Sequence, residues 1–258
     1  MRLGCSILVA LVMMLVGSSA HAIVNVMSKS DQKADVGLTG TISGSLSYQS
    51  GNIELLRIEG GTNLVYRHHE HTYILKGAYA FFGEYMNAPN SIINKGFGHL
   101  RYRYRLEDWL QIESFGQGQF DKILRIKLRL LWGAGLRFEY NMENLGLEAG
   151  TTYMLEREVE EDDYWDNVSF GSLVNRWSNY LMVTWDVAEN VTVGTMNFFQ
   201  PRFDRFCDYR IYHDLYLELS ANQQLSMRLS YEVQYDSSPW PSVDPIDRGV
   251  KTTLGVNF

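Results

Sequence analysis

The sequence has few cysteines, few prolines and no long apolar run after its first residues. Of 258 residues, two are Cys and five are Pro. Cys5 lies in the apolar leader, so a chain without the leader keeps Cys207 alone, which excludes a disulfide framework. No chemical partner for Cys207 is visible nearby, and we expect a structural thiol.

A transmembrane helix is also missing beyond the leader. From residue 23 onward no segment approaches the ~20 continuous apolar residues that such a helix needs. Hydropathy alone would therefore favour a soluble protein. Hydropathy averages over both faces of a strand, however, so it can miss a membrane β-barrel completely.

An excess of basic residues is absent as well. The chain has 23 Lys and Arg against 30 Asp and Glu; without Arg2 of the leader the formal charge is 22 − 30 = −8. A nucleic-acid-binding protein usually carries a basic excess. The composition therefore argues against nucleic acid as a partner.

The first 22 residues have the organisation of a secretory signal peptide. Arg2 precedes an apolar stretch at 7–16, and small residues follow up to Ala22. This pattern predicts export and cleavage after Ala22. A membrane anchor is the weaker interpretation because the apolar stretch is too short to span a bilayer.

The rest of the chain is dominated by residue-by-residue alternation. In LRIKLRLLWGAGLRF, residues 124–138, the apolar series begins at Leu124 and ends at Phe138, and the other series contains four cations. A strand sends successive side chains to opposite faces, so this segment is predicted to have one apolar and one basic face. It is also much longer than the usual strand of about 5–6 residues.

The same alternation recurs along the chain with variable clarity. It predicts strands at 38–48, 52–66, 72–85, 99–106, 109–121, 124–138, 144–157, 173–186, 190–200, 208–220, 225–236 and 250–258. Long apolar rows on so many strands suit lipid outside and a polar interior, whereas a soluble sandwich has little use for them. We therefore predict an all-β fold, a transmembrane antiparallel up-and-down β-barrel of about twelve strands.

The connections between these strands sort alternately into two ends. One end has short turns at 67–71, 107–109, 141–144, 186–190 and 221–224, and the other has mostly long loops, including 84–94, 156–167, 200–208 and 236–247. Aromatic residues gather near the short turns: Tyr66, Tyr73, Trp109, Tyr140, Trp185 and Phe258. Short periplasmic turns, long external loops and aromatic girdles are typical of bacterial outer-membrane barrels.

These patterns predict the organisation and location of the protein. The expected parts are a signal peptide at 1–22, a periplasmic N-terminal extension at 23–37 and a barrel at 38–258 in the outer membrane of a Gram-negative bacterium. The expected partners are outer-membrane lipid and the barrel assembly machinery, because the chain ends in an alternating strand with Phe258 at its terminus, which resembles the assembly signal.

Many of the alternate residues that are predicted to face the lumen are charged. We predict that the lumen is lined by Arg101, Arg103, Arg105, Glu113, Arg125, Lys127, Arg129 and Arg137. Two interpretations stay open. A salt-bridge network would close or narrow the barrel, whereas a basic wall around an open path would favour small anionic solutes, because rings of Arg or Lys select anions in pores.

Several segments together resemble a known family. They are YQSGNIELLRIEGGTNLVYR at 48–67, LRIKLRLLWGAGLRFEY at 124–140 and LSYEVQYDSSPWP at 229–241 with KTTLGVNF at the end. The chain is similar, over roughly 38–258, to the salt-induced outer-membrane protein family, the bacterial domain of unknown function 481. The resemblance implies an outer-membrane barrel linked to salt or osmotic stress and supplies no catalytic residues.

An enzyme, a metal site and a cofactor are not predicted. A lipid hydrolase on the outer wall would need a Ser beside a His base, and His213 has no Ser two residues away on its own face. The sequence leaves open whether a Ser on a neighbouring strand lies beside this His. The His68, His69 and His71 cluster sits in one tight turn, which favours a solvated periplasmic turn over a metal site.

Overall fold

The computed structural model describes residues 36–49, 55–84, 91–160, 173–239 and 243–257. These residues form twelve strands: β1 (Gly37–Gln49), β2 (Leu55–His68), β3 (His71–Glu84), β4 (Ser91–Glu107), β5 (Leu110–Asp121), β6 (Ile126–Asn141), β7 (Leu145–Glu160), β8 (Val174–Ala188), β9 (Val191–Pro201), β10 (Tyr209–Ser220), β11 (Leu225–Asp236) and β12 (Ile246–Asn257). Within these ranges no helix is long and apolar enough to cross a membrane.

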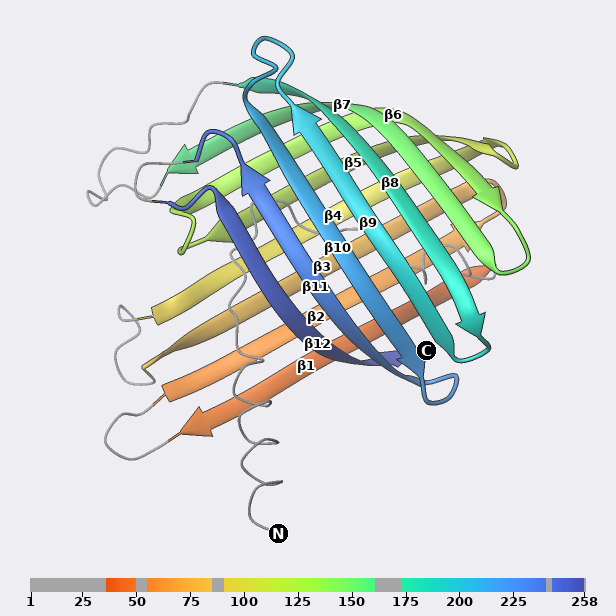
Figure 1. The fold of residues 1–258 in the computed structure, drawn as a ribbon, viewed down its shortest axis with the longest axis horizontal. Helices are drawn as coiled ribbons and strands as arrows, with labels where there is room; N and C mark the ends of the chain where they lie inside the picture. Colours follow the sequence, from red (N-terminus) through yellow and green to blue (C-terminus); the bar gives the residue numbers. More distant parts are fainter. Residues whose placement is uncertain (1–35, 50–54, 85–90, 161–172, 240–242, 258) are drawn as a thin grey trace.

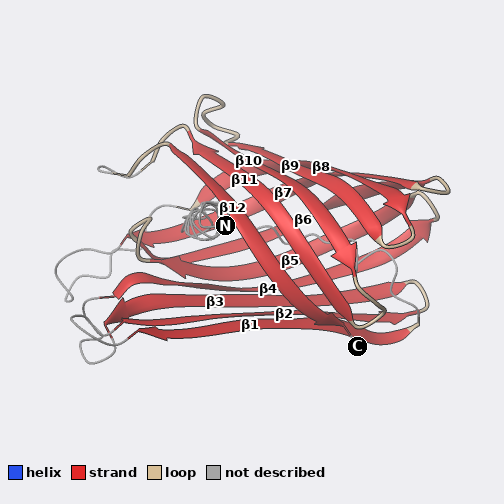
Figure 2. Cartoon of the chain, turned by 60° about the horizontal axis from the view of Figure 1, so that its bottom comes forward, coloured by secondary structure: helices blue, strands red, loops and turns tan. Residues whose placement is uncertain are grey.

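Each strand pairs antiparallel with the next, and β1 pairs with β12, so the sheet closes into a barrel (Figures 1 and 2). The predicted up-and-down barrel of about twelve strands is therefore confirmed. The boundaries differ in places: β4 begins at Ser91 rather than at residue 99, so the last four residues of the predicted 84–94 loop are strand. The predicted signal peptide and the assembly residue Phe258 lie outside the described residues, as does most of the predicted extension at 23–37.

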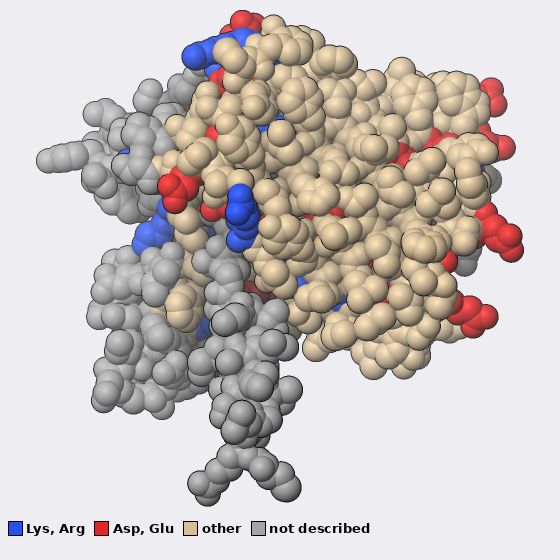
Figure 3. Space-filling view, viewed as in Figure 1, with Lys and Arg blue, Asp and Glu red and all other residues tan. Residues whose placement is uncertain are grey.

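Apolar side chains cover the outside of the barrel and polar ones fill the inside. On β4 the outward Leu100 is 56% exposed, while the inward Arg101 and Arg103 are buried. Figure 3 shows an outer surface that is mostly uncharged across its middle, with most charged residues toward the two ends. Water outside would reverse this arrangement, so the surrounding medium is lipid, and this closed barrel belongs to the bacterial outer membrane.

Aromatic rings mark the two edges of the apolar band. At the short-turn end the Tyr73 ring stacks on Tyr66 and lies tilted against Tyr102, with ring centroids 6.3 and 5.2 Å away. At the long-loop end Tyr209 contacts Phe199 and Tyr235, both at 5.7 Å. The predicted aromatic residues at the short turns that the structure describes, Tyr66, Tyr73, Trp109, Tyr140 and Trp185, are all exposed, and a second aromatic group lies at the other edge.

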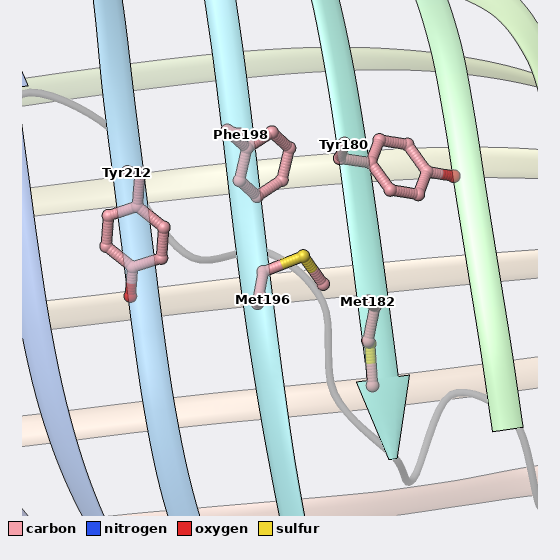
Figure 4. Packing of buried hydrophobic residues seen from close by; sticks show 5 residues of the cluster. All are labelled: Tyr180, Met182, Met196, Phe198 and Tyr212. Carbon is pink, nitrogen blue, oxygen red and sulfur yellow. The ribbon is translucent and has the colours of Figure 1, made fainter. Parts of the chain in front are cut away.

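The lumen also contains a small apolar cluster, because some of the alternate residues of β8 and β9 that face inward are apolar. Its members are Tyr180, Met182, Met196, Phe198 and Tyr212, from β8, β9 and β10 (Figure 4). The Phe198 ring lies 5.6 Å from Tyr180 and 6.2 Å from Tyr212, centroid to centroid. These rings fix the position of Tyr180, whose hydroxyl donates to Glu113 Oε2 at 3.2 Å.

Tyr180 fits against the barrel wall because β7 has a glycine at the point of contact. A Cβ atom on Gly150 would overlap the Tyr180 ring, which is itself buried. A side chain at this position must therefore displace Tyr180 and disturb its hydrogen bond to Glu113.

We expect Gly150→Val to lower the free energy of unfolding by about 1–3 kcal/mol, the usual cost of overpacking. The measurement is urea unfolding of the refolded barrel in lipid vesicles, followed by Trp fluorescence. Gly98→Val is the matched control, because Gly98 faces lipid and a Cβ there meets nothing within 4 Å. Equal stability of the two variants would show that Tyr180 does not depend on Gly150.

Candidate functional site in the barrel lumen

The basic and acidic strands of the barrel meet in a luminal ion-pair network. We use this name for the paired residues of β4–β11 that face inward: Arg101, Arg103, Glu113, Arg129, Arg137, Glu139, Glu148, Glu156, Glu158, Arg176, Asp208, Arg210 and Asp236. Most of them are nearly inaccessible to solvent. Such pairs contribute to stability only when their geometry is good and their remaining hydrogen bonds are satisfied.

Glu156 is the centre of the part of the network nearer the long loops. Its carboxylate accepts hydrogen bonds from Arg210 Nη1 at 2.7 and 2.8 Å and from Arg176 Nε at 3.0 Å. The same two guanidinium groups also contact carboxylates on their other sides: Arg210 Nε lies 2.7 Å from Asp236, and Arg176 Nη2 lies 3.0 Å from Asp208. The chain of pairs ties β7 to its neighbour β8, β10 to its neighbour β11 and, across the lumen, β7 to β10.

Glu113 is the centre of the part nearer the short turns. It lies 3.1 Å from Arg101 and 3.7 Å from Arg103, and it also accepts the Tyr180 hydroxyl. Beside it Arg137 pairs with Glu148 on β7 and with Glu139, both at 2.5 Å. Together the two parts occupy the half of the lumen bounded by β4–β10.

The structure places the eight predicted luminal residues in different environments. Five lie in the network: Arg101, Arg103, Glu113, Arg129 and Arg137. Arg105 is half-exposed at the end of β4, 4.0 Å from Glu70 of the adjacent turn.

The predicted luminal positions of Arg125 and Lys127 are wrong. Arg125 lies in the turn before β6, with φ of 58°, and the pairing of β6 with β7 shifts between Ile126 and Leu128. This irregularity inverts the parity, so Leu124 and Ile126 are buried against Val243 while Lys127 is exposed. Asp121 signals the turn in the sequence, since its carboxylate accepts the amides of residues 123 and 124 at 2.9 and 3.2 Å.

The described residues of the other half of the lumen enclose a cavity. A cavity of about 370 Å³ lies between β1–β5 and β10–β12. Its cations are Lys76, Lys95, Arg228 and Lys251, and its carboxylates are Glu59, Asp121, Asp214 and Glu232. We call it the lysine-lined cavity.

The lysine-lined cavity exists because the first strands send small side chains inward. Ser43, Gly61, Ala78 and Ala80 line it, whereas the strands opposite carry Arg, Gln and Tyr. The spaces beside the predicted arginines are far smaller, about 30 Å³ at Arg101 and Arg129 and about 10 Å³ at Arg103 and Arg137. The arginines therefore fill the lumen more than they line a path.

Sequence reasoning missed the three lysines of this cavity. Lys95 has the same parity as Arg101 and Arg103, but it precedes the predicted start of that strand. Lys76 lies at 72–85, where the alternation is weaker, whereas Lys251 lies in the clear alternation at 250–258 but was not singled out. Extending the parity of β4 toward its N-terminus would have found Lys95.

The outer wall of β7–β10 carries a polar patch within the apolar band. His213 Nδ1 lies 2.7 Å from Asn197 Oδ1, and Asn197 Nδ2 donates to Thr195 at 3.3 Å. His213 and Asn197 resemble two members of a Ser–His–Asn arrangement. The residues that flank His213 on its face or pair with it on β11 are Ile211, Leu215 and Val233, so none of these described neighbours is a nucleophile.

The histidine turn between β2 and β3 has local partners. His71 Nδ1 lies 2.8 Å from the Tyr102 hydroxyl, and the His68 and His69 rings pack edge to face at 4.2 Å. Within the described part of the chain, no group of three or more His, Cys, Asp or Glu residues has the geometry to hold a metal ion. The geometry of the turn suits stacking with the aromatic girdle.

Removing the carboxylate of Glu156 should leave Arg176 and Arg210 buried without their shared partner. We expect Glu156→Gln to lower the free energy of unfolding by about 3–5 kcal/mol, the range for breaking a buried ion pair. The measurement is the urea midpoint in lipid vesicles. Glu59→Gln is the control, because the Arg57–Glu59 pair is 26% and 38% exposed and should contribute about 0–1 kcal/mol. A loss for Glu156→Gln no larger than for Glu59→Gln would refute a stabilising role of the network.

The barrel is similar to solved outer-membrane proteins at low sequence identity. The NanC porin shares 12% identity, with 85% of this chain and 97% of that chain covered and a TM-score of 0.49. An outer-membrane channel from Pseudomonas putida F1 shares 9%, with 90% and 98% covered and a TM-score of 0.48. The translocator domain of the autotransporter NalP from Neisseria meningitidis shares 8%, with 89% and 90% covered and a TM-score of 0.48.

A search of curated proteins finds no match to this chain. A family model does match, over residues 42–258, which includes all twelve strands in whole or in part. The link to salt stress that the resemblance implied stays a prediction. The predicted family membership is confirmed: the chain belongs to the family described as "Protein of unknown function, DUF481".

Proposed function

We propose that this barrel is a narrow outer-membrane channel for small polar solutes, with its path in the lysine-lined cavity. The observation that carries the proposal is the division of the lumen. The ion-pair network fills the side of β4–β10, while the other side keeps a cavity of about 370 Å³ with polar and charged walls. An eight-stranded barrel is filled by side chains and the large porins are open, so twelve strands allow this intermediate state.

The charges around the cavity favour a mild preference for anions. Four cations and four carboxylates line it. Two of the carboxylates have arginine partners, since Glu59 lies 2.8 Å from Arg57 and Asp214 lies 2.7 Å from Arg228. Three lysines then oppose Asp121 and Glu232. The basic wall expected from Arg101–Arg105 and Arg125–Arg137 is replaced in this proposal by Lys76, Lys95 and Lys251.

The link to salt or osmotic stress is a separate part of the proposal. It rests on the family resemblance alone. A path that carries charges of both signs at close range would respond to ionic strength, because the screening length falls from about 10 Å at 0.1 M salt to about 3 Å at 1 M.

The channel is tested by planar-bilayer recordings of the refolded mature chain in a salt gradient. Wild type should conduct, and Lys76→Gln, Lys95→Gln and Lys251→Gln together should move the reversal potential toward cation preference. One charge about 4 Å from an ion is worth about 4 kcal/mol at an effective dielectric near 20, before screening. Since a net loss of ~0.7 kcal/mol already corresponds to about threefold in permeability ratio, the shift should be measurable.

The control is Lys127→Gln, because Lys127 is exposed outside the cavity. Its selectivity should equal that of wild type. A correctly folded wild-type barrel without conductance would refute the channel in favour of a closed barrel. Equal selectivity of the conducting wild type and the triple lysine variant would refute the placement of the path.

A further inference from the structure

The barrel closes along an unusually short seam. β1 pairs with β2 over its whole length, from Gly37 opposite Arg67 to Gln49 opposite Leu55. Of the described residues of β1, only Thr41 and Ile42 pair with β12, opposite Asn257 and Val256. Figures 1 and 2 show the two strands meeting near the C-terminal end of β12 and diverging toward its other end.

The position of the paired residues places the opening in one leaflet of the membrane. Thr41 Oγ1 donates to Asn257 Oδ1 at 2.7 Å, near the start of β1 and the end of β12, on the short-turn side of the barrel. The unpaired stretch therefore runs toward the long-loop side. With the short turns in the periplasm, the seam is closed at the inner leaflet and open at the outer leaflet.

An open seam is costly in hydrocarbon. Each backbone polar group without a hydrogen bond there costs several kcal/mol. On β12 the stretch from Ile246 to Gly255 has β11 on one side and no strand of the described residues on the other. Such an edge persists only where water or a ligand with polar groups reaches it, as at the rim of an aqueous cavity.

The lysine-lined cavity reaches this edge. Its lining includes Ser43 and Gly44 on β1 and residues 251–254 on β12, so both sides of the seam border it. Leu254 is 69% exposed and Ile42 is 57% exposed on the outer face beside the opening. One side of the seam thus meets polar walls and the other meets lipid.

The walls of the cavity are amphipathic. Ala78, Ala80 and Phe97 present apolar surface, and Lys76, Lys95 and Lys251 present cationic groups. Asp214 and Glu59 are paired with arginines, as described above. A molecule with an apolar chain and an anionic head group would satisfy both kinds of wall, and such a molecule partitions into a lipid leaflet like the one that the seam faces.

We propose that the β1–β12 seam is a lateral opening through which an anionic single-chain amphiphile passes between the outer leaflet and the lysine-lined cavity. This inference uses the cavity of the proposed channel but does not require ion conduction. The head group would lie at the three lysines, and the chain would extend toward the seam between Gly44 and Leu254.

The test blocks the seam after folding and measures uptake of 11-(dansylamino)undecanoic acid. The protein carries Cys207→Ser, so that Gly44→Cys is the one cysteine of the mature chain. The refolded barrel in nanodiscs is labelled with a biotin–polyethylene glycol maleimide, and heat-modifiable gel migration shows that it stays folded. Labelling should weaken binding of the probe by roughly tenfold, about 1.4 kcal/mol.

The matched control is Gly98→Cys with the same label. Gly98 also faces lipid and has open space around it, but it lies on β4, away from the seam. Its label should leave binding unchanged. Equal binding by both labelled proteins would overturn the lateral opening. Dansylglycine, which lacks the chain, should bind poorly to the unlabelled barrel; binding as tight as that of the long-chain probe would overturn the amphiphile.

The head-group site is tested with Lys76→Gln, Lys95→Gln and Lys251→Gln together. Binding of the anionic probe should fall, and binding of its uncharged amide should not. An equal fall for both probes would overturn recognition of the anionic head. Recordings on the same samples keep the two proposals separate, because a barrel without conductance that still takes up the probe through an unblocked seam refutes the channel alone.

Discussion

The structure depends on one constraint, which is that no backbone polar group can remain unpaired in hydrocarbon. A chain that cannot form a membrane helix meets this constraint only by closing its sheet. Closure sends alternate side chains of every strand into the lumen, so the interior must accommodate all of these inward-facing side chains. Here it carries arginines, glutamates and glutamines from β4–β10, which sit far from bulk water and must satisfy one another. The luminal ion-pair network is therefore a consequence of closure as well as a stabilising feature.

The same constraint explains why the lumen has two unlike halves. Long charged side chains reach the middle of the barrel and pair there, as Glu156 does with Arg176 and Arg210. The small inward residues of β1–β3, such as Ser43, Gly61 and Ala78, cannot reach across. Space remains beside them, and the charges that border it come from neighbouring strands. The cavity and the network thus have one cause, the unequal volume of inward side chains around the barrel.

The fold could be predicted from the sequence because its signal has a period of two and is repeated twelve times. Leu100, Tyr102 and Tyr104 and the two arginines between them indicate the two faces of β4 directly. The site could be predicted only in part. Arg101 and Glu113 follow from parity, but their pairing depends on which strands lie opposite across the lumen. The predicted position of Lys127 was wrong because one irregularity of pairing in β6 reverses which residues before it face inward. The hydropathy pattern does not show where such a shift occurs.

The short pairing between β1 and β12 is the point where closure is least complete, and it lies beside the emptiest part of the lumen. These two facts are related. In the filled half, side chains that span the lumen, such as Arg210 between Glu156 and Asp236, hold strands at a fixed distance. Along the seam the described inward residues of β1 are short, so its register with β12 rests on backbone bonds and on Thr41 with Asn257. A barrel whose ion pairs stabilise one half of its wall from inside will open in the other half.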